Sequence, residues 1–193
     1  MSQNKQHNLQ HHKPFVLWFT GFSGAGKSTI AEAVTQRFMA SGETVHVLDG
    51  DVVRKGLCSD LSYTDTDRNE NIRRVAEVAK LALDSGSIVL AALISPKQAQ
   101  RQQARDTFKK GEFIEVFIDT AFEECEKRDI KGLYKKARLG EIKNFTGIDS
   151  KYEIPRESEI HIKTAQQTLE ESVGQVFDYL VSQHYLKKQL KKE

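Results

Sequence analysis

Cysteine, an excess of charge of one sign and long apolar runs are all scarce in this sequence of 193 residues. The two cysteines, Cys58 and Cys125, have neither the spacing of metal ligands nor that of a redox pair. The 29 basic and 27 acidic residues leave a formal net charge of only +2, so composition gives no electrostatic case for binding nucleic acid or an anionic membrane. Any anion must therefore be bound by a local cluster.

No stretch approaches the roughly 20 apolar residues that cross a bilayer, and the first dozen residues lack the apolar core of a signal peptide. We therefore expect a cytoplasmic protein without a membrane partner. Residues 1–13 are polar and rich in Gln, Asn and His, which predicts a flexible N-terminal arm. With 38% apolar residues overall, residues 14–193 predict a single domain.

Apolar, β-branched stretches alternate with amphipathic ones along the chain. The first kind predicts strands at residues 15–20, 44–49, 87–94, 113–119 and 159–163. The second kind predicts helices at residues 28–41, 67–85, 96–109 and 165–182. This alternation is typical of an α/β fold in which helices cover both faces of a parallel sheet. Residues 50–65 and 129–155 fit neither pattern and are long for connections, which favours a functional role.

A glycine-rich segment, GFSGAGKS at residues 21–28, lies between the first expected strand and the first expected helix. Its spacing matches the Walker A pattern, in which glycines let backbone N–H groups converge on phosphates and the helix adds its positive N-terminal end. Lys27 is expected to bridge the β- and γ-phosphates of ATP, and Ser28 to bind Mg²⁺. A glycine-rich turn without catalytic meaning is the alternative, which the flanking strand and helix disfavour. The expected ATP-binding residues here are Gly21, Phe22, Ser23, Gly24, Ala25, Gly26, Lys27, Ser28 and Thr29.

A magnesium site also needs a carboxylate. The strand at residues 87–94 ends without one, whereas the strand at residues 44–49 runs into Asp49-Gly50-Asp51. Ligands of open α/β sheets gather at this carboxyl edge. One carboxylate can associate with the metal while the other accepts a proton from an attacking hydroxyl, and the sequence does not fix which does which. We take Asp49 as the metal residue and Asp51 as the base, the alternative being that Asp49 only opens a turn.

Four further segments follow the Walker A segment: LDGDVVRKGL at residues 48–57, DRNENIRR at 67–74, ISP at 94–96 and KNFTGID at 143–149. In this order they resemble the adenylylsulfate kinase family, in its bacterial stand-alone form, over about residues 15–164. The resemblance implies a P-loop NTPase fold of the nucleotide-kinase type, a three-layer sandwich with a mobile lid at about residues 129–155. It also implies a homodimer that phosphorylates the 3′-hydroxyl of adenylylsulfate with ATP in sulfate assimilation.

The resemblance also assigns an acceptor site. Arg54 and Arg68 are expected on the sulfate and phosphate of adenylylsulfate, a task that suits the planar guanidinium group. Asn71 is expected near the same group. Tyr63 and Phe145 are expected to stack on the two faces of the adenine, with Tyr63 standing where the family usually has Phe.

The nucleotide-facing turn and the lid complete the expected site. The resemblance implies that Ile94 and Ser95 line the acceptor and that Ser95 carries a phosphoryl group in some members, although direct in-line transfer does not require it. In the basic lid, Arg128 is expected to bind the cofactor ATP and Lys135 the acceptor. The expected catalytic residues are then Lys27, Asp51 and Ser95, and the carboxylates Asp49 and Asp51 are also expected to contact the acceptor.

The sequence departs from the family pattern at Lys97-Gln98, where an aromatic or His followed by Arg is common, which puts any contact attributed to that arginine in doubt. Two other functions stay open. One is a P-loop kinase for another small-molecule or nucleoside acceptor, since such kinases differ mainly in the acceptor pocket. The other is a nucleotide-binding regulatory domain without turnover, which the presence of Lys27, Ser28 and both carboxylates argues against.

Overall fold

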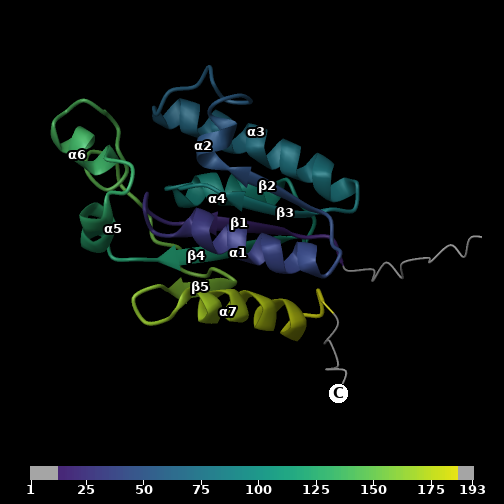
Figure 1. Cartoon of the computed structure of the whole chain (residues 1–193). Coiled ribbons are helices and arrows are strands. Elements are labelled where there is room, and N and C mark those ends of the chain that lie inside the picture. Colours follow the sequence, from purple (N-terminus) through teal and green to yellow (C-terminus); the bar gives the residue numbers. More distant parts are fainter. Residues whose placement is uncertain (1–12, 187–193) are drawn as a thin grey trace, which may run out of the picture.

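The computed structural model describes residues 13–186, in which five parallel strands form one sheet in the order β2-β3-β1-β4-β5 (Figure 1). The strands are β1 (Val16–Thr20), β2 (Val45–Asp49), β3 (Ile88–Ala92), β4 (Phe113–Asp119) and β5 (Ile160–Lys163). Each expected strand is confirmed to within two residues at either end. The expected N-terminal arm lies outside the described residues apart from Lys13.

Seven helices are present in the described part of the chain. They are α1 (Lys27–Ala40), α2 (Gly50–Val53), α3 (Asp65–Asp84), α4 (Gln98–Asp106), α5 (Phe122–Arg128), α6 (Leu133–Arg138) and α7 (Leu169–Ser182). The four expected helices are α1, α3, α4 and α7, and the short α2, α5 and α6 were not expected. The predicted start of α7 at residue 165 is wrong, because Thr168 caps the helix in a reciprocal pair of hydrogen bonds with Glu171.

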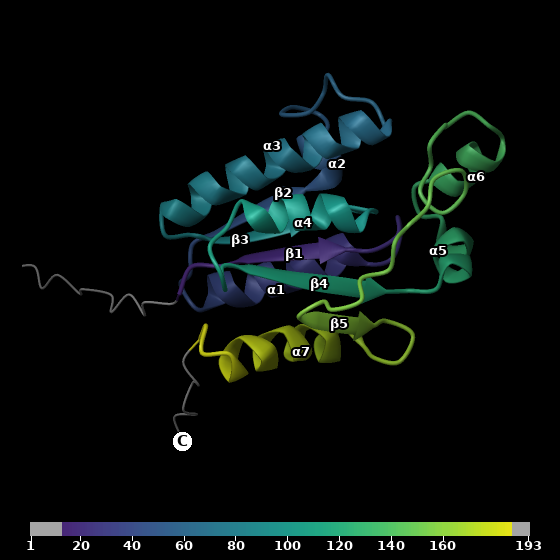
Figure 2. The ribbon, with the colours of Figure 1, turned by 180° about the vertical axis from the view of Figure 1, so that it is seen from behind.

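Both faces of the sheet are covered, which gives three layers (Figures 1 and 2). Along the central strand β1, Leu17 and Phe19 belong to the apolar cluster that includes residues of α1 and α7. Val16 and Trp18 belong to the cluster on the opposite face, with residues of α3 and α4. All five residues of β1 are buried, as expected of a strand in the middle of a parallel sheet. The α/β three-layer fold is thereby confirmed.

The carboxyl ends of the strands carry the functional segments. In Figure 2 the chain leaves β4 through α5 and returns to β5 through a long connection that contains α6, and we call residues 129–155 of this connection the lid segment. The glycine-rich segment follows β1, Asp49 ends β2, and Ser95 comes shortly after β3. Because β3 pairs in parallel with both β1 and β2, the carboxyl ends of these three strands lie side by side at one edge of the sheet.

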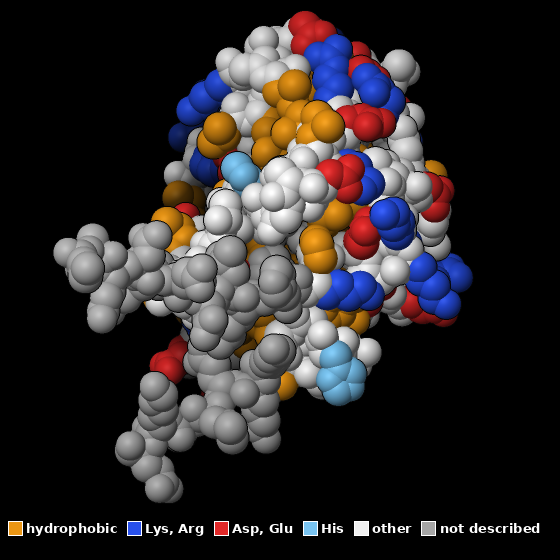
Figure 3. All heavy atoms as spheres, turned by 90° about the vertical axis from the view of Figure 1, so that its right-hand side faces the viewer, with side chains coloured by type: hydrophobic (Ala, Val, Ile, Leu, Met, Phe, Trp, Pro, Cys, Tyr) orange, Lys and Arg blue, Asp and Glu red, His pale blue; other side chains and the backbone are white. Residues whose placement is uncertain are grey.

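The molecular surface fits the nearly balanced composition. On the face shown in Figure 3, basic and acidic side chains are interspersed rather than gathered into a patch of one sign. Among residues 13–186, the structure contains no helix that is both long enough and apolar enough to cross a membrane.

Candidate active site

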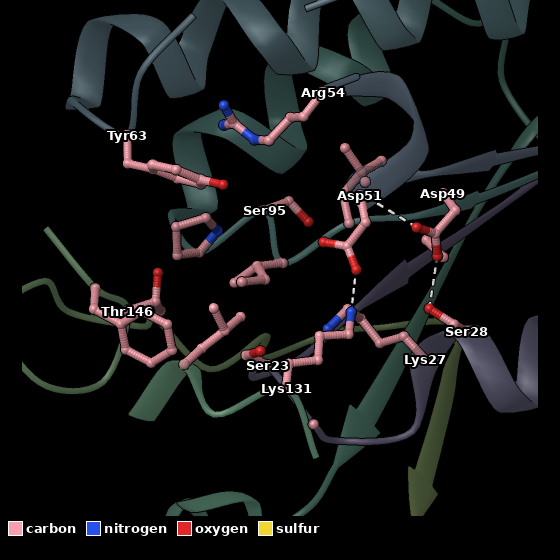
Figure 4. A pocket seen from close by; sticks show the side chains of 18 of the residues that line it. Ser23, Lys27, Ser28, Asp49, Asp51, Arg54, Tyr63, Ser95, Lys131 and Thr146 are labelled. Carbon is pink, nitrogen blue, oxygen red and sulfur yellow. Dashed lines mark hydrogen bonds and ion pairs between the residues drawn. The ribbon is translucent and has the colours of Figure 1, made fainter. Parts of the chain in front are cut away.

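A cavity of about 410 Å³ opens at the carboxyl edge of the sheet, between the glycine-rich segment, α2, the start of α3, the turn after β3 and the lid segment (Figure 4). It brings together fifteen of the residues expected from the sequence. These are Ser23, Gly24, Gly26, Lys27, Ser28, Thr29, Asp49, Asp51, Arg54, Tyr63, Arg68, Asn71, Ile94, Ser95 and Phe145. Residues far apart in the chain therefore share one solvent-accessible space.

The glycine-rich segment has the backbone of a phosphate cradle. At Gly21 a Cβ atom would come within 2.6 Å of the Ile118 carbonyl oxygen, so only glycine lets the loop pass this close to β4. Gly26 has a φ of 104° and precedes α1, the 14-residue helix whose first turn carries no acidic residue. The N–H groups at the start of α1 are thus available to an anion, whose charge the helix end favours.

Lys27 is buried at the floor of this loop. Its amino group donates hydrogen bonds to the carbonyl oxygens of Phe22, at 2.7 Å, and Gly21, at 3.1 Å. Burial lowers the pKa of Lys27 to about 8 from the ordinary 10.5, although the carboxylates Asp49 and Asp51 oppose the shift. Among the described residues, this buried ammonium group is held by carbonyl oxygens, so it is well placed to bind the negative charge of phosphates.

Ser28 and Asp49 form a direct polar pair. The Ser28 hydroxyl donates a hydrogen bond of 2.6 Å to Oδ2 of Asp49, while Oδ1 of Asp49 accepts one of 2.9 Å from the backbone N–H of Asp51. This second bond caps α2 and fixes the carboxylate. Asp49 therefore does open a turn, as the alternative interpretation held, and its carboxylate also contacts the Ser28 hydroxyl of the P-loop. Hard oxygen donors of this kind suit Mg²⁺.

Asp51 pairs with Lys131 of the lid segment, and Figure 4 shows the two side chains pointing at each other across the cavity. Both side chains are more than half exposed, so solvent screens this pair and it is easily broken. The contact was not expected from the sequence, because 80 residues separate the partners. It links the expected base to the lid segment.

Two arginines and an aromatic ring form the wall opposite the phosphate loop. The guanidinium group of Arg54 lies 4.2 Å from the centre of the Tyr63 ring. Arg68 donates hydrogen bonds to the carbonyl oxygens of Tyr63, at 3.0 Å, and Asn144, at 2.6 Å. Burial and the nearby charge of Arg54 lower the pKa of Arg68, which means that two positive groups are held close together. An anionic group between them would relieve this repulsion.

Phe145 lines the same cavity from the lid segment. The residue is 8% exposed, and its ring packs edge-on against Tyr134, with 4.9 Å between the ring centres. Nearby, Thr146 Oγ1 and Asn71 Nδ2 are buried without a hydrogen-bond partner among the described residues. Unpaired buried polar atoms are costly, so their presence in the lining of a cavity points to a bound molecule that satisfies them.

Ser95 lies in a strained turn beside the cavity. Its φ is 39°, in the left-handed region that a serine rarely adopts. The side chain is almost fully buried, and its oxygen accepts a hydrogen bond of 3.2 Å from the indole N–H of Trp18. Ile94 and Ser95 of this turn line the cavity, and the Ser95 hydroxyl oxygen accepts the Trp18 hydrogen bond.

Five expected site residues do not line the cavity. Gly21 and Ala25 are buried in the loop, and Phe22 packs edge-on against Phe122 with 5.4 Å between the ring centres. Arg128 forms an ion pair of 2.9 Å with Glu124 along the exposed side of α5. The side chain of Lys135 is exposed on α6. Neither Arg128 nor Lys135 is among the residues that line the cavity.

Comparison with known proteins decides the family. A model of the family described as adenylylsulphate kinase matches residues 13–163. The chain belongs to the adenylylsulphate kinase family. The kinase of this family from Vibrio vulnificus is 54% identical over 183 residues, which cover 95% of this chain and 86% of the relative. The one from Aeromonas hydrophila is 60% identical over 153 residues, 79% of this chain and 78% of the relative.

A solved adenylylsulfate kinase structure also matches. The Mycobacterium tuberculosis enzyme CysC, in complex with AMPPNP and APS, superposes with a TM-score of 0.84 at 43% identity, covering 88% of this chain and 98% of that one. The expected P-loop NTPase fold is thereby confirmed.

Some lining residues of this adenylylsulfate kinase family member were missed from the sequence. They include Ile72, Leu133, Tyr134, Ile142 and Thr146. A signal for Thr146 was present, since it follows Phe145 in the KNFTGID segment. No pattern distinguished Tyr134, whose hydroxyl donates a hydrogen bond of 2.8 Å to the Ser23 carbonyl oxygen and so ties the lid segment to the P-loop.

Proposed function

We propose that the chain transfers the γ-phosphoryl group of ATP to the 3′-hydroxyl of adenylylsulfate, giving 3′-phosphoadenylylsulfate and ADP for sulfate assimilation. One observation carries this proposal. A single cavity joins a P-loop with Lys27 at its floor to a wall of two arginines and two aromatic rings, as an acceptor with both an anionic group and a purine requires. The likeness to a kinase solved with AMPPNP and APS supports it.

The P-loop side would hold ATP. Backbone N–H groups and the start of α1 would bind the phosphates, and Lys27 would exchange its two carbonyl partners for phosphate oxygens. Ser28 and Asp49 fit Mg²⁺, because both present hard oxygen atoms next to the loop. When bound, Mg²⁺ supplies charge neutralisation of the transferred group.

The acceptor side would orient the 3′-hydroxyl. Arg54 and Arg68 would bind the phosphosulfate group, and Tyr63 and Phe145 would stack on the adenine. The Asp51 carboxylate would accept the proton of the attacking hydroxyl once Lys131 has released it. Positioning and charge stabilisation would then supply most of the rate enhancement.

Direct in-line transfer suits this site better than a phosphoserine intermediate. Ser95 has only 3% of its surface exposed, and its hydroxyl oxygen accepts a hydrogen bond from the Trp18 indole N–H. Phosphorylation of Ser95 would place a dianionic group in this buried turn, which is unfavourable without further partners. We therefore propose that Ser95 lines the acceptor rather than carrying the phosphoryl group.

The lid segment would close over both substrates. Closing would exclude water from the γ-phosphate and so limit futile hydrolysis of ATP. The exposed cations Arg128 and Lys135 would reach the substrates only in the closed state. We further propose that the protein works as a homodimer in the cytoplasm. Light scattering coupled to size exclusion would test the dimer. A structure of the related kinase from Thiobacillus denitrificans is described as hexameric, so a hexamer is the outcome that would contradict it.

A coupled assay of ADP release tests the proposed function. ADP release that requires both ATP and adenylylsulfate, with 3′-phosphoadenylylsulfate identified by mass spectrometry, is the expected result. ADP release that is independent of adenylylsulfate but depends on another alcohol would instead indicate a different acceptor. No release with any acceptor, together with retained ATP binding, would indicate a regulatory nucleotide-binding domain.

A further inference from the structure

Arg101 lies behind the Ser95 turn and has only 2% of its surface exposed. From helix α4, it donates a hydrogen bond of 2.9 Å to the Ser95 carbonyl oxygen and one of 2.8 Å to the Glu153 carbonyl oxygen. Its Nε lies 2.8 Å from Oε1 of Glu115 on β4, a charge contact that lacks good hydrogen-bond alignment. One buried cation thus holds a sheet strand, the strained turn and the end of the lid segment together.

The Ser95 turn needs such support because its backbone is strained. A serine at a φ of 39° persists only when surrounding contacts hold it there. The Thr20 hydroxyl donates a hydrogen bond of 2.7 Å to the Ile94 carbonyl oxygen, one residue earlier. Arg101 and Thr20 therefore hold successive carbonyl groups of the turn that faces the acceptor side of the cavity.

The same anchors reach the end of the lid segment. The backbone N–H of Glu153 donates a hydrogen bond of 2.7 Å to the Pro96 carbonyl oxygen, and the Glu153 carboxylate accepts one of 2.7 Å from the N–H of Gln98. The hydroxyls of Tyr152 and Thr20 are 3.0 Å apart. The end of the lid segment is thus attached to the strained turn by several hydrogen bonds.

We propose that Arg101 is a positioning residue, which sets the acceptor-facing backbone of Ile94 and Ser95 and fixes the point from which the lid segment closes. The inference rests on the proposed function of the same site. Arg101 is not among the residues that line the cavity, so its effect passes through the two carbonyl groups that it binds. Loss of these bonds is expected to weaken binding of the acceptor far more than binding of ATP, because the P-loop lies between β1 and α1.

Arg105 provides a matched control on the same helix. Its guanidinium group pairs with Glu159, at 2.6 Å, and with Glu115, at 3.4 Å, and it also donates a hydrogen bond to the Phe113 carbonyl oxygen. It therefore shares the buried acidic partner of Arg101, while its contacts within the described residues go to strand β4 and Glu159. A general loss of charge pairing in this network would affect both arginine variants alike.

The test compares Arg101→Lys with Arg105→Lys in the full-length protein. Lysine keeps a positive charge beside Glu115 but cannot reproduce the fork that reaches two carbonyl groups. We expect Arg101→Lys to raise the KM for adenylylsulfate about tenfold or more, the usual scale for a lost charge-assisted hydrogen bond, and the KM for ATP much less. Arg105→Lys should leave both constants near those of the unaltered protein.

Thr20→Val is the second variant, because it removes one neutral hydrogen bond to the turn at nearly constant volume. It should raise the KM for adenylylsulfate by about threefold to tenfold, and if Arg101→Lys does not fold, an unchanged KM in Thr20→Val overturns the claim that support of this turn sets the acceptor. Unchanged KM values for adenylylsulfate in the folded variants, or equal changes in Arg101→Lys and Arg105→Lys, overturn this inference but leave the proposed function standing. If the unaltered protein shows no adenylylsulfate-dependent ADP release, the proposed function falls and the inference falls with it.

Discussion

The Ser28 hydroxyl and the Asp49 carboxylate, 2.6 Å apart, join the start of α1 to the end of β2 across the sheet edge. Neither residue is adjacent to the other in sequence, and β3 lies between their strands. The pair is therefore a product of the strand order, and it places the oxygen donors proposed for Mg²⁺ beside the loop proposed for the phosphates. Five predictions test the roles assigned around this edge.

Lys27→Ala should reduce turnover by about 10²-fold to 10³-fold, the usual effect of removing one group that stabilises charge in the transition state. Steady-state ADP release measures it, with circular dichroism as the control for folding. Near-normal turnover would show that Lys27 does not act on the transferred phosphate.

Nucleotide binding should take up protons at pH 9. In the free protein Lys27 has a pKa of about 8 and is largely neutral at pH 9, whereas the phosphates should move the pKa back toward 10.5 and so restore the ammonium. Calorimetric titration with AMPPNP in two buffers of different ionisation enthalpy counts the protons. At pH 7, where Lys27 is protonated in both states, its contribution should vanish. Proton release at pH 9 would contradict the assignment.

Asp51→Asn should lower kcat by about 10²-fold to 10⁴-fold, the range typical of a lost general base. Because Asp51 is exposed and also pairs with Lys131, the variant should still bind ATP with nearly unchanged affinity. Single-turnover kinetics separates the chemical step from binding. In the equivalent variant Asp49→Asn, added Mg²⁺ should instead restore part of kcat. If added Mg²⁺ restores kcat only in Asp51→Asn, then Asp51 is the metal residue and Asp49 the base.

Phe145→Ala should weaken adenylylsulfate binding by about 1–3 kcal/mol, as for other rings that stack on a base. Equilibrium dialysis with labelled adenylylsulfate measures the affinity. Phe145→Trp is a useful control, since it keeps a flat aromatic face. Unchanged affinity in the alanine variant would exclude Phe145 from the adenine pocket.

Asn71→Leu should leave the free protein as stable as before or slightly more stable. Asn71 is 5% exposed and its Nδ2 has no partner among the described residues, so an apolar group of similar shape removes an unsatisfied polar atom. The same variant should bind adenylylsulfate more weakly. Thermal unfolding and binding are measured on one preparation, and a clear loss of stability would show that Asn71 supports the fold instead.

The inner strands of the sheet were readable from the sequence because β1, β3 and β4 are buried on both faces. Residues 15–20, for example, are almost entirely apolar, and β1 runs from Val16 to Thr20. Helix α5 was missed for the converse reason. It has seven residues, FEECEKR, of which only Cys125 is buried, so it shows no apolar periodicity of its own. Such short helices form because contacts with the rest of the folded protein stabilise them.

The ligand-facing residues followed mainly from motifs, and their partners did not. The Walker A spacing located Lys27 and Ser28, but nothing in the sequence indicates that Lys131 meets Asp51 or that Arg101 supports Ser95. These contacts depend on how the lid segment and α4 pack against the sheet. A side chain that binds another residue's carbonyl group also does not depend on which side chain that residue carries. The sequence therefore gives no sign of the contact.

Two of the proposed acceptor contacts lie outside the sheet, Tyr63 in the connection before α3 and Phe145 in the lid segment. The phosphate loop, in contrast, is held between strand β1 and helix α1. Tyr63 is about half exposed, so an exchange there can alter the acceptor site without disturbing the apolar interior, whereas Phe145 belongs to the main apolar cluster. Engineering of a different small-molecule preference would therefore begin at Tyr63 rather than in the lid segment.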